Sequence, residues 1–199
     1  MTRRPNWFSR EFSFDLPLST YPNIVERLRG TPARLEDRIS SLPGKTLTRR
    51  DRNNWSIQEN AGHLLDLEPL GMDRLDDFAA ERQTLRAADL ANRKTYEANH
   101  NSSAIKDVLL SFRAARLAFV ERLDGFDQAF VQRTATHPRL KREMRVLDLA
   151  FFIAEHDDHH LARITELIRL FESQGTPHAT SGKLERANRL EGIAFSSTR

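Results

Sequence analysis

Three of the seven histidines of this 199-residue sequence lie within five positions, in a stretch that reads EHDDHH at residues 155–160. If the stretch is helical, His156 and His160 lie about 40° apart within the apolar stripe that runs from Leu149 to Phe171. His159 is turned about 100° away from His160, towards the flank of that stripe. Side chains four residues apart on a helix have Cβ atoms roughly 5–6 Å apart, so both imidazoles could bind one metal ion.

The residues alone leave three explanations for two imidazoles on an apolar face. Burying them without partners would cost free energy. They could therefore bind a metal, they could form hydrogen bonds with carboxylates in a polar core network, or the face could be open to water. An HxxxH pair also occurs by chance, so a third ligand elsewhere in the chain would be needed to favour the metal.

Four long amphipathic segments are predicted to be the helices that position these residues. Gly30 and Pro32 predict a bend or a division in the first, a capping box of Ser56 and Glu59 starts the second, and Pro69 predicts a kink or short break within it. For the third, Val108, Leu109, Phe112, Leu117 and Val120 are among the side chains expected to face inward. The segments are residues 22–42, 56–83, 103–123 and 147–172.

Four such helices with intervening loops predict an all-α four-helix bundle. Residues 84–101 are predicted to form an extra loop with a short helix between the second and third long helices, and no strand is expected. We predict one domain over residues 1–175, followed by a polar tail at 176–199 with a possible short helix at 183–190.

The composition limits the partners and the kinds of site. There is no cysteine, so any metal must be bound by His, Asp, Glu or water, and the chain offers no thiolate nucleophile. Net charge is +3 from 31 basic and 28 acidic residues, and the basic clusters at 45–52 and 139–145 are interpreted as solvated loops, so nucleic acid is not an expected partner. Neither a signal peptide nor a membrane helix is predicted, and a cytoplasmic protein is expected.

A pattern of tryptophan, acid and histidine resembles a known family. The sequence WSxxExxxHLxDxE at residues 55–68, followed by the late HxxxH at 156–160, resembles the DinB/YfiT-like superfamily over about residues 22–172. The resemblance implies a metal-binding four-helix bundle, often a homodimer, with zinc or nickel bound by His63, His156 and His160. Among characterised relatives it implies thiol-dependent S-transferases and a mycothiol-dependent isomerase.

The function expected on this basis is a metal-dependent thiol S-transferase, or a related thiol-dependent enzyme, that acts on a small molecule. A divalent cation stabilises a thiolate at neutral pH, and a low-molecular-weight thiol would replace the absent cysteine. The alternatives are a non-catalytic metal-binding or stress-response bundle and a metal-dependent hydrolase. A peptidase with Asp157 as general base in an HDxxH motif is disfavoured, because Asp is shorter than the usual Glu and no substrate-binding strand is expected.

Several polar side chains near the candidate ligands could have either a functional role or an ordinary structural one. No catalytic residue is assigned. Glu59 and Asp66 could orient His63, although Glu59 is already explained as a cap. The remaining four could relay protons or face substrate, or could simply be solvated: Tyr96, Asn99, Asp157 and His159.

Overall fold

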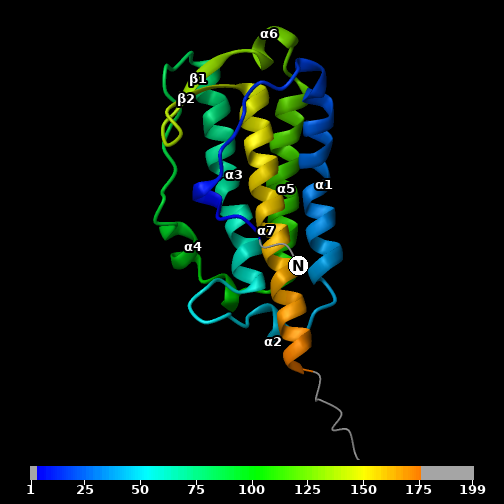
Figure 1. Cartoon of the computed structure of the whole chain (residues 1–199). Helices are drawn as coiled ribbons and strands as arrows, with labels where there is room; N and C mark the ends of the chain where they lie inside the picture. Colours follow the sequence, from blue (N-terminus) through cyan, green and yellow to red (C-terminus); the bar gives the residue numbers. More distant parts are fainter. Residues whose placement is uncertain (1–3, 176–199) are drawn as a thin grey trace, which may run out of the picture.

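The computed structural model describes residues 4–175, and four long helices pack side by side in it (Figure 1). Helix α1 contacts α5 and α7, and α3 contacts the same two helices, so each helix has two neighbours. The all-α four-helix bundle predicted from the sequence is confirmed. The long helices are α1 (Tyr21–Ile39), α3 (Ile57–Ala79), α5 (Ile105–Asp124) and α7 (Val146–Gly175).

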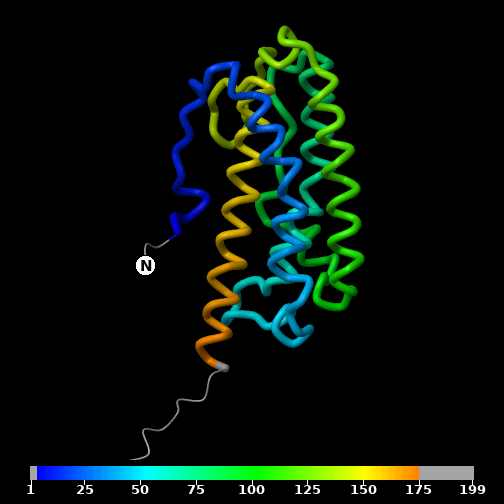
Figure 2. The backbone as a smooth tube through the Cα atoms, turned by 90° about the vertical axis from the view of Figure 1, so that its right-hand side faces the viewer, coloured from blue at the N-terminus to red at the C-terminus, as the bar shows by residue number. Residues whose placement is uncertain are grey.

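Between α3 and α5 the chain returns along the length of the bundle, so that these two helices run in the same direction (Figures 1 and 2). This crossover holds the short helix α4 (Arg93–Ala98) and a 3-10 turn at His100–Ser102, as expected for residues 84–101. Shorter helices elsewhere are α2 (Gly44–Leu47) and α6 (Gln128–Val131), with 3-10 turns at Trp7–Ser9 and Leu18–Thr20.

Neither proline inside a long helix interrupts it. Of the predicted alternatives, the division of the first helix and the break in the second are therefore wrong, and the bend and the kink stay predictions. Pro32 removes the donor for the carbonyl of Leu28, and Arg116 supplies a replacement from α5 through Nη1 at 3.4 Å. A donor from a neighbouring helix thus compensates for the backbone N–H group that is missing at Pro32. Near Pro69, the Lys94 ammonium on the crossover donates to the carbonyl of Asp66 at 3.1 Å.

Two further sequence expectations need correction. Leu117 was expected to face inward but is 45% exposed, whereas its neighbour Arg116 is buried, because carboxylates on other helices pair with it. A short hairpin also exists where no strand was expected. Strands β1 (Thr134–His137) and β2 (Arg142–Arg145) pair antiparallel, with Ala135 opposite Met144 and both buried. Four-residue strands with so few apolar positions give little alternation to detect.

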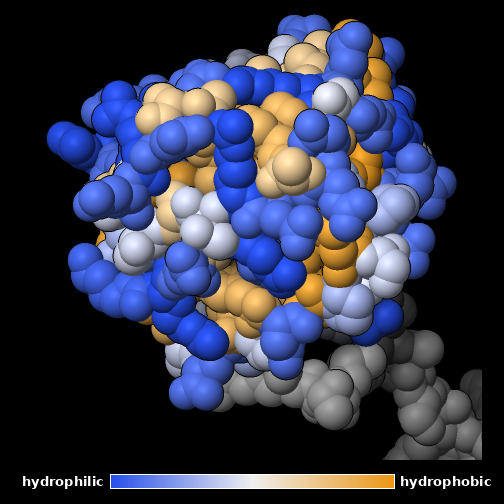
Figure 3. All heavy atoms as spheres, turned by 90° about the horizontal axis from the view of Figure 1, so that it is seen from above, coloured by the Kyte–Doolittle hydropathy of each residue, from blue (hydrophilic) through white to orange (hydrophobic). Residues whose placement is uncertain are grey.

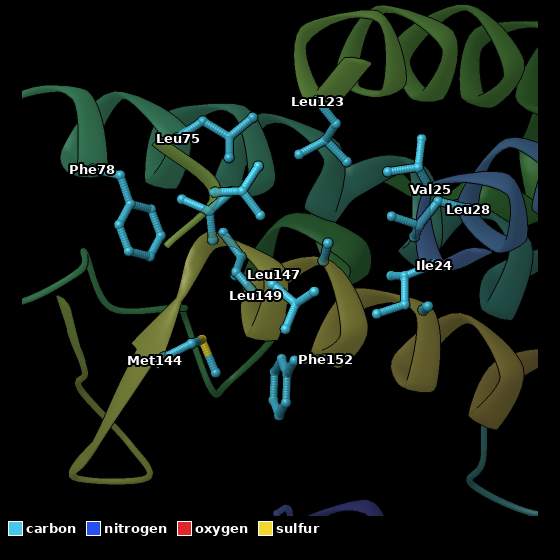
Figure 4. Close-up of a cluster of buried hydrophobic side chains, with 14 of the residues drawn as sticks. Ile24, Val25, Leu28, Leu75, Phe78, Leu123, Met144, Leu147, Leu149 and Phe152 are labelled. Carbon is cyan, nitrogen blue, oxygen red and sulfur yellow. The ribbon is translucent and has the colours of Figure 1, made fainter. Parts of the chain in front are cut away.

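The apolar core is divided into two clusters along the bundle axis. Figure 4 shows the cluster near the hairpin, which includes Leu75, Phe78, Leu147 and Phe152. The other cluster lies towards α2 and includes Phe112 of α5. On α7 the clusters occupy residues 146–154 and 161–171, so residues 155–160 lie between them. We call this intermediate level the polar layer; it contains Thr31, Glu68, Arg116, Asp157 and the histidines of α7.

Within residues 4–175, no helix is long and apolar enough to cross a membrane. Viewed from the end of the bundle that carries the hairpin, the surface shows polar side chains interspersed with apolar patches (Figure 3). The predicted tail at 176–199, with its possible helix at 183–190, lies outside the described residues.

Candidate metal centre

A cavity of about 380 Å³ lies between α3 and α7 and reaches the polar layer. The two helices form its walls through residues such as Leu67, Gly71 and Ile153. Other parts of the chain complete the lining, including residues 87–92 of the crossover, residues 137–139 at the hairpin, Arg116 with Phe119 on α5, and Trp7 with Phe8 near the amino terminus. A volume of this size suits a small molecule.

The three histidines predicted as ligands meet at this cavity. Their ring centroids are 5.4 Å apart for His63 and His156, 4.8 Å for His63 and His160, and 4.6 Å for His156 and His160. One ring nitrogen from each lies within 4.8 Å of the others, so the group could hold a metal ion. The Nε2 atoms of His156 and His160 are 3.3 Å apart and face each other.

Hydrogen bonds fix which ring nitrogen of His160 faces the group. Asn60 donates its side-chain N–H to the carbonyl of Ser56 at 2.7 Å, and this leaves its Oδ1 towards His160. The Nδ1–H of His160 donates to that Oδ1 at 2.9 Å. The Nε2 of His160 is therefore the unprotonated atom available to a metal.

Thr95 on α4 plays the corresponding part for His63. Its buried hydroxyl lies 3.0 Å from Nδ1 of His63, so Nε2 is left for the metal group. Of the two residues that the sequence offered for this task, Glu59 forms the predicted capping box with Ser56 and pairs with Arg50. Nothing in the sequence around Thr95 marks it, because its position depends on how the crossover returns along the bundle.

Asp66 binds His100 instead of His63. The His100 Nε2 lies 2.8 Å from the Asp66 carboxylate, and both side chains are buried. The ring of His100 also lies so close to Gly62 that a Cβ added there would be 2.2 Å from it. Gly62 therefore permits the close approach of the crossover to α3, immediately before His63.

Burial keeps the three imidazoles neutral at physiological pH. Loss of solvation, followed by repulsion from His156, lowers the pKa of His63 to about 3. Loss of solvation also lowers the pKa of His156 to about 3 and that of His160 well below its usual range. Neutral imidazoles keep the lone pair that a metal ligand needs. The ring centroids of Trp55 and His63 are 4.6 Å apart, and those of Trp7 and His156 are 4.9 Å apart.

The acidic neighbours of these histidines are held by arginines. Asp157 is 1% exposed and accepts hydrogen bonds from Arg116 and from the Thr31 hydroxyl, so its interpretation as a solvated surface residue is wrong. Glu68 binds the same guanidinium at 2.5 Å. Glu155 and Asp158 also pair with arginines.

The remaining candidates lie at the edge of the site or outside it. His159 lines the cavity but contacts Arg4 and Trp7, and it is absent from the three-histidine group. Tyr96 is 61% exposed and packs on Trp55, and Asn99 ends α4 in a left-handed conformation. Neither Tyr96 nor Asn99 lines the cavity.

The donor set fits a divalent transition metal. Three neutral imidazoles at the wall of a cavity provide the ligand number typical of catalytic zinc sites, in which one position is left for water or substrate. Imidazole ligands also suit nickel. The arrangement could therefore activate a small molecule that enters the cavity.

Comparison with known proteins agrees with this fold. No curated protein matches the chain in sequence. YfiT from Bacillus subtilis, described as a probable metal-dependent hydrolase with an unusual four-helix bundle topology, superposes with a TM-score of 0.70 and 18% sequence identity. The match covers 82% of this chain and 94% of YfiT. The family model of the DinB superfamily matches residues 27–164, and on that match this chain belongs to the DinB superfamily.

Proposed function

We propose that the protein binds one divalent metal ion, zinc or nickel, through His63, His156 and His160, and that it uses this ion to transfer a small-molecule thiol. The observation that carries the proposal is the convergence of three neutral imidazoles at the wall of a small-molecule cavity. A bound divalent cation supplies a stabilised thiolate, or an acidified water, at neutral pH.

The protein's own residues contribute binding and orientation. Asn60 holds His160 in the required tautomer, and Thr95 orients the ring of His63. The indole rings of Trp7 and Trp55 and the aromatic side chain of Phe152 give the cavity apolar walls, which shield the reacting groups from water. Because the sequence has no cysteine, the thiol must enter as a co-substrate.

Hydrolysis is the second candidate, and the description of YfiT as a probable metal-dependent hydrolase favours it. A hydrolase would gain from a free general base beside the metal. Among the described residues, the carboxylates that line the cavity are Glu68, Asp89 and Asp157, and each is bound to an arginine. A thiol is far more acidic than water even before it binds a metal, so it can lose its proton to solvent without such a base, and this favours thiol transfer.

A screen for turnover tests the proposal. Protein loaded with zinc or nickel should accelerate the reaction of 1-chloro-2,4-dinitrobenzene with at least one of a panel of low-molecular-weight thiols, followed by absorbance, and a chelator should abolish the rate. Metal-loaded protein that accelerates no thiol reaction would instead support a non-catalytic metal-binding bundle. Cleavage of 4-nitrophenyl esters without thiol would support the hydrolase.

The expected homodimer and the cytoplasmic location rest on the family resemblance and on sequence composition, and they stay predictions.

A further inference from the structure

The end of the cavity beside the hairpin contains a buried hydrogen-bond donor without an acceptor. His137 is 3% exposed, and its Nδ1 accepts the backbone N–H of Leu140 at 3.2 Å. The proton of the neutral ring is therefore on Nε2. In the described part of the chain, this Nε2 is buried and has no partner. Burial, together with Arg74 and Arg139, lowers the pKa of His137 to about 3, so the ring stays neutral.

Two guanidinium groups lie at the same end, and neither has an ion pair among the described residues. Nη2 of Arg139 is buried without a partner, while its guanidinium packs on Phe8 and Phe152. Arg74 is 4% exposed and donates Nε to the carbonyl of Arg86 at 3.1 Å. Burial is the main cause that lowers the pKa of Arg74 to about 10.

The contrast with Arg116 shows what is missing. Arg116 lines the same cavity, but two carboxylates neutralise it. Asp77, the acid whose charge acts on Arg74, pairs with Arg82 and Arg86. Among the described residues, the hairpin end therefore holds two buried donor atoms without an acceptor, His137 Nε2 and Arg139 Nη2, beside the Arg74 guanidinium, which has no ion pair. A buried donor cluster of this kind is stable when an anionic acceptor completes it.

The donor cluster and the histidine group belong to one cavity. Arg74 follows His63 by eleven residues, about three turns and about 16 Å along α3, and returns to nearly the same face. On α7, the ring of Phe152 lies 5.2 Å from that of His137 and one turn before His156. Apolar side chains line the intervening length. A ligand could therefore have one end at the histidines and the other at the donors.

We propose that Arg74, His137 and Arg139 form an anion-binding subsite, and that the cavity takes a small molecule with an apolar body and a terminal carboxylate or phosphate. The inference rests on the proposed function, because it places the reacting end of that molecule at the histidine group. The planar guanidinium groups can each donate to two oxygens of either anion, and the His137 Nε2–H supplies a third donor.

Isothermal titration calorimetry with three probes of similar shape tests this. The probes are 4-phenylbutyrate, 2-phenylethyl phosphate and the neutral 4-phenylbutan-1-ol, added to metal-free and to zinc-loaded protein in phosphate-free buffer. At least one anion should bind tenfold or more tightly than the alcohol in both forms. The tighter anion identifies carboxylate or phosphate as the preferred group. Equal affinity for all three probes would overturn the proposal.

Variants distinguish anion binding at the subsite from general electrostatic attraction to the protein. Arg139→Gln and Arg74→Met should each weaken binding of the anion at least tenfold and leave the alcohol unchanged. Arg142→Gln, on the same hairpin but outside the cavity, should behave as wild type. Thermal unfolding without ligand should show Arg74→Met to be no less stable, because it removes an unpaired buried charge.

Either of two results would overturn the proposed anion-binding subsite. If Arg142→Gln lowered the affinity for the anion as much as Arg139→Gln does, the anion would be held only by attraction to the charged surface. Binding of 4-phenylbutyrate that requires zinc and ignores Arg139→Gln would mean that the carboxylate binds the metal. Because the metal-free titration needs no zinc, failure of the metal site would leave the anion result standing, and the two proposals can fail separately.

Discussion

Two groups of buried polar side chains occupy the interior of this bundle, and they differ in whether the protein satisfies them. In the polar layer, Arg116 is held by Glu68 and Asp157, and Thr31 completes the set from α1. Along the cavity, the histidine group leaves Nε2 atoms facing one another, and the hairpin end leaves buried donors without acceptors.

This difference distinguishes buried polar groups that stabilise the fold from buried polar groups that are available to bind a ligand. Removing polar groups from water costs free energy that internal partners must offset. The Arg116 cluster has those partners and joins four helices through them. The cavity groups are only partly satisfied by the described residues: the Nε2 atoms of His156 and His160 face each other, and His137 Nε2 and Arg139 Nη2 have no partner. This is the pattern expected where a metal ion and a ligand complete the site.

The largest expected effect concerns metal binding by the histidine group. His160→Ala should remove tight zinc binding altogether, because it deletes a ligand whose ring is already oriented by Asn60. His159→Ala should bind zinc with an affinity lowered at most about 10–100-fold, as for a residue outside the ligand set. Calorimetric titration with zinc, with His156→Ala alongside, measures both. Loss of zinc from His159→Ala but not from His160→Ala would mean that the ligand assignment is wrong.

In the polar layer, where Arg116 has its partners, Asp157→Ala should lower the free energy of unfolding even in metal-free protein. It leaves Arg116 buried with Glu68 as its remaining carboxylate, and breaking a buried pair costs about 3–5 kcal/mol. Urea unfolding of metal-free protein measures this cost. The neighbouring Asp158→Ala, which removes more exposed ion pairs with Arg27 and Arg34, is the control and should cost at most about 1 kcal/mol. Equal costs would erase the distinction between the two groups.

A smaller effect concerns pH and His137. Its folded pKa, about 3, lies below the usual 6.5, so the unfolded chain binds a proton first as pH falls. Its contribution to stability is therefore complete above about pH 6.5 and declines towards pH 3. Between pH 7 and pH 5 this amounts to roughly 2 kcal/mol. His137→Gln should lose that much less stability over the same interval in urea titrations; an unchanged slope would mean that His137 is solvated.

Helical periodicity in the sequence predicted the bundle and the shared face of His156 and His160, whereas the family resemblance added His63 to the predicted ligands. The continuity of α1 could not be predicted, since the donor that compensates for Pro32 comes from Arg116, 84 positions later in the sequence. The orientation of His63 by Thr95 depends on the path of the crossover. The hairpin donors were missed for a similar reason: Arg139 was interpreted as part of a solvated loop, and only the packing of the hairpin against Phe152 places it in the cavity.

The position of Thr95 has a consequence for how two ligands would influence each other. It orients His63, and the crossover that carries it also forms a wall of the cavity at residues 87–92. A small molecule that displaces this wall would change the hydrogen bond to His63, and thereby the affinity for metal. Thermodynamic linkage then requires the metal to change the affinity for the small molecule by the same factor, so occupancy of either site would report on the other.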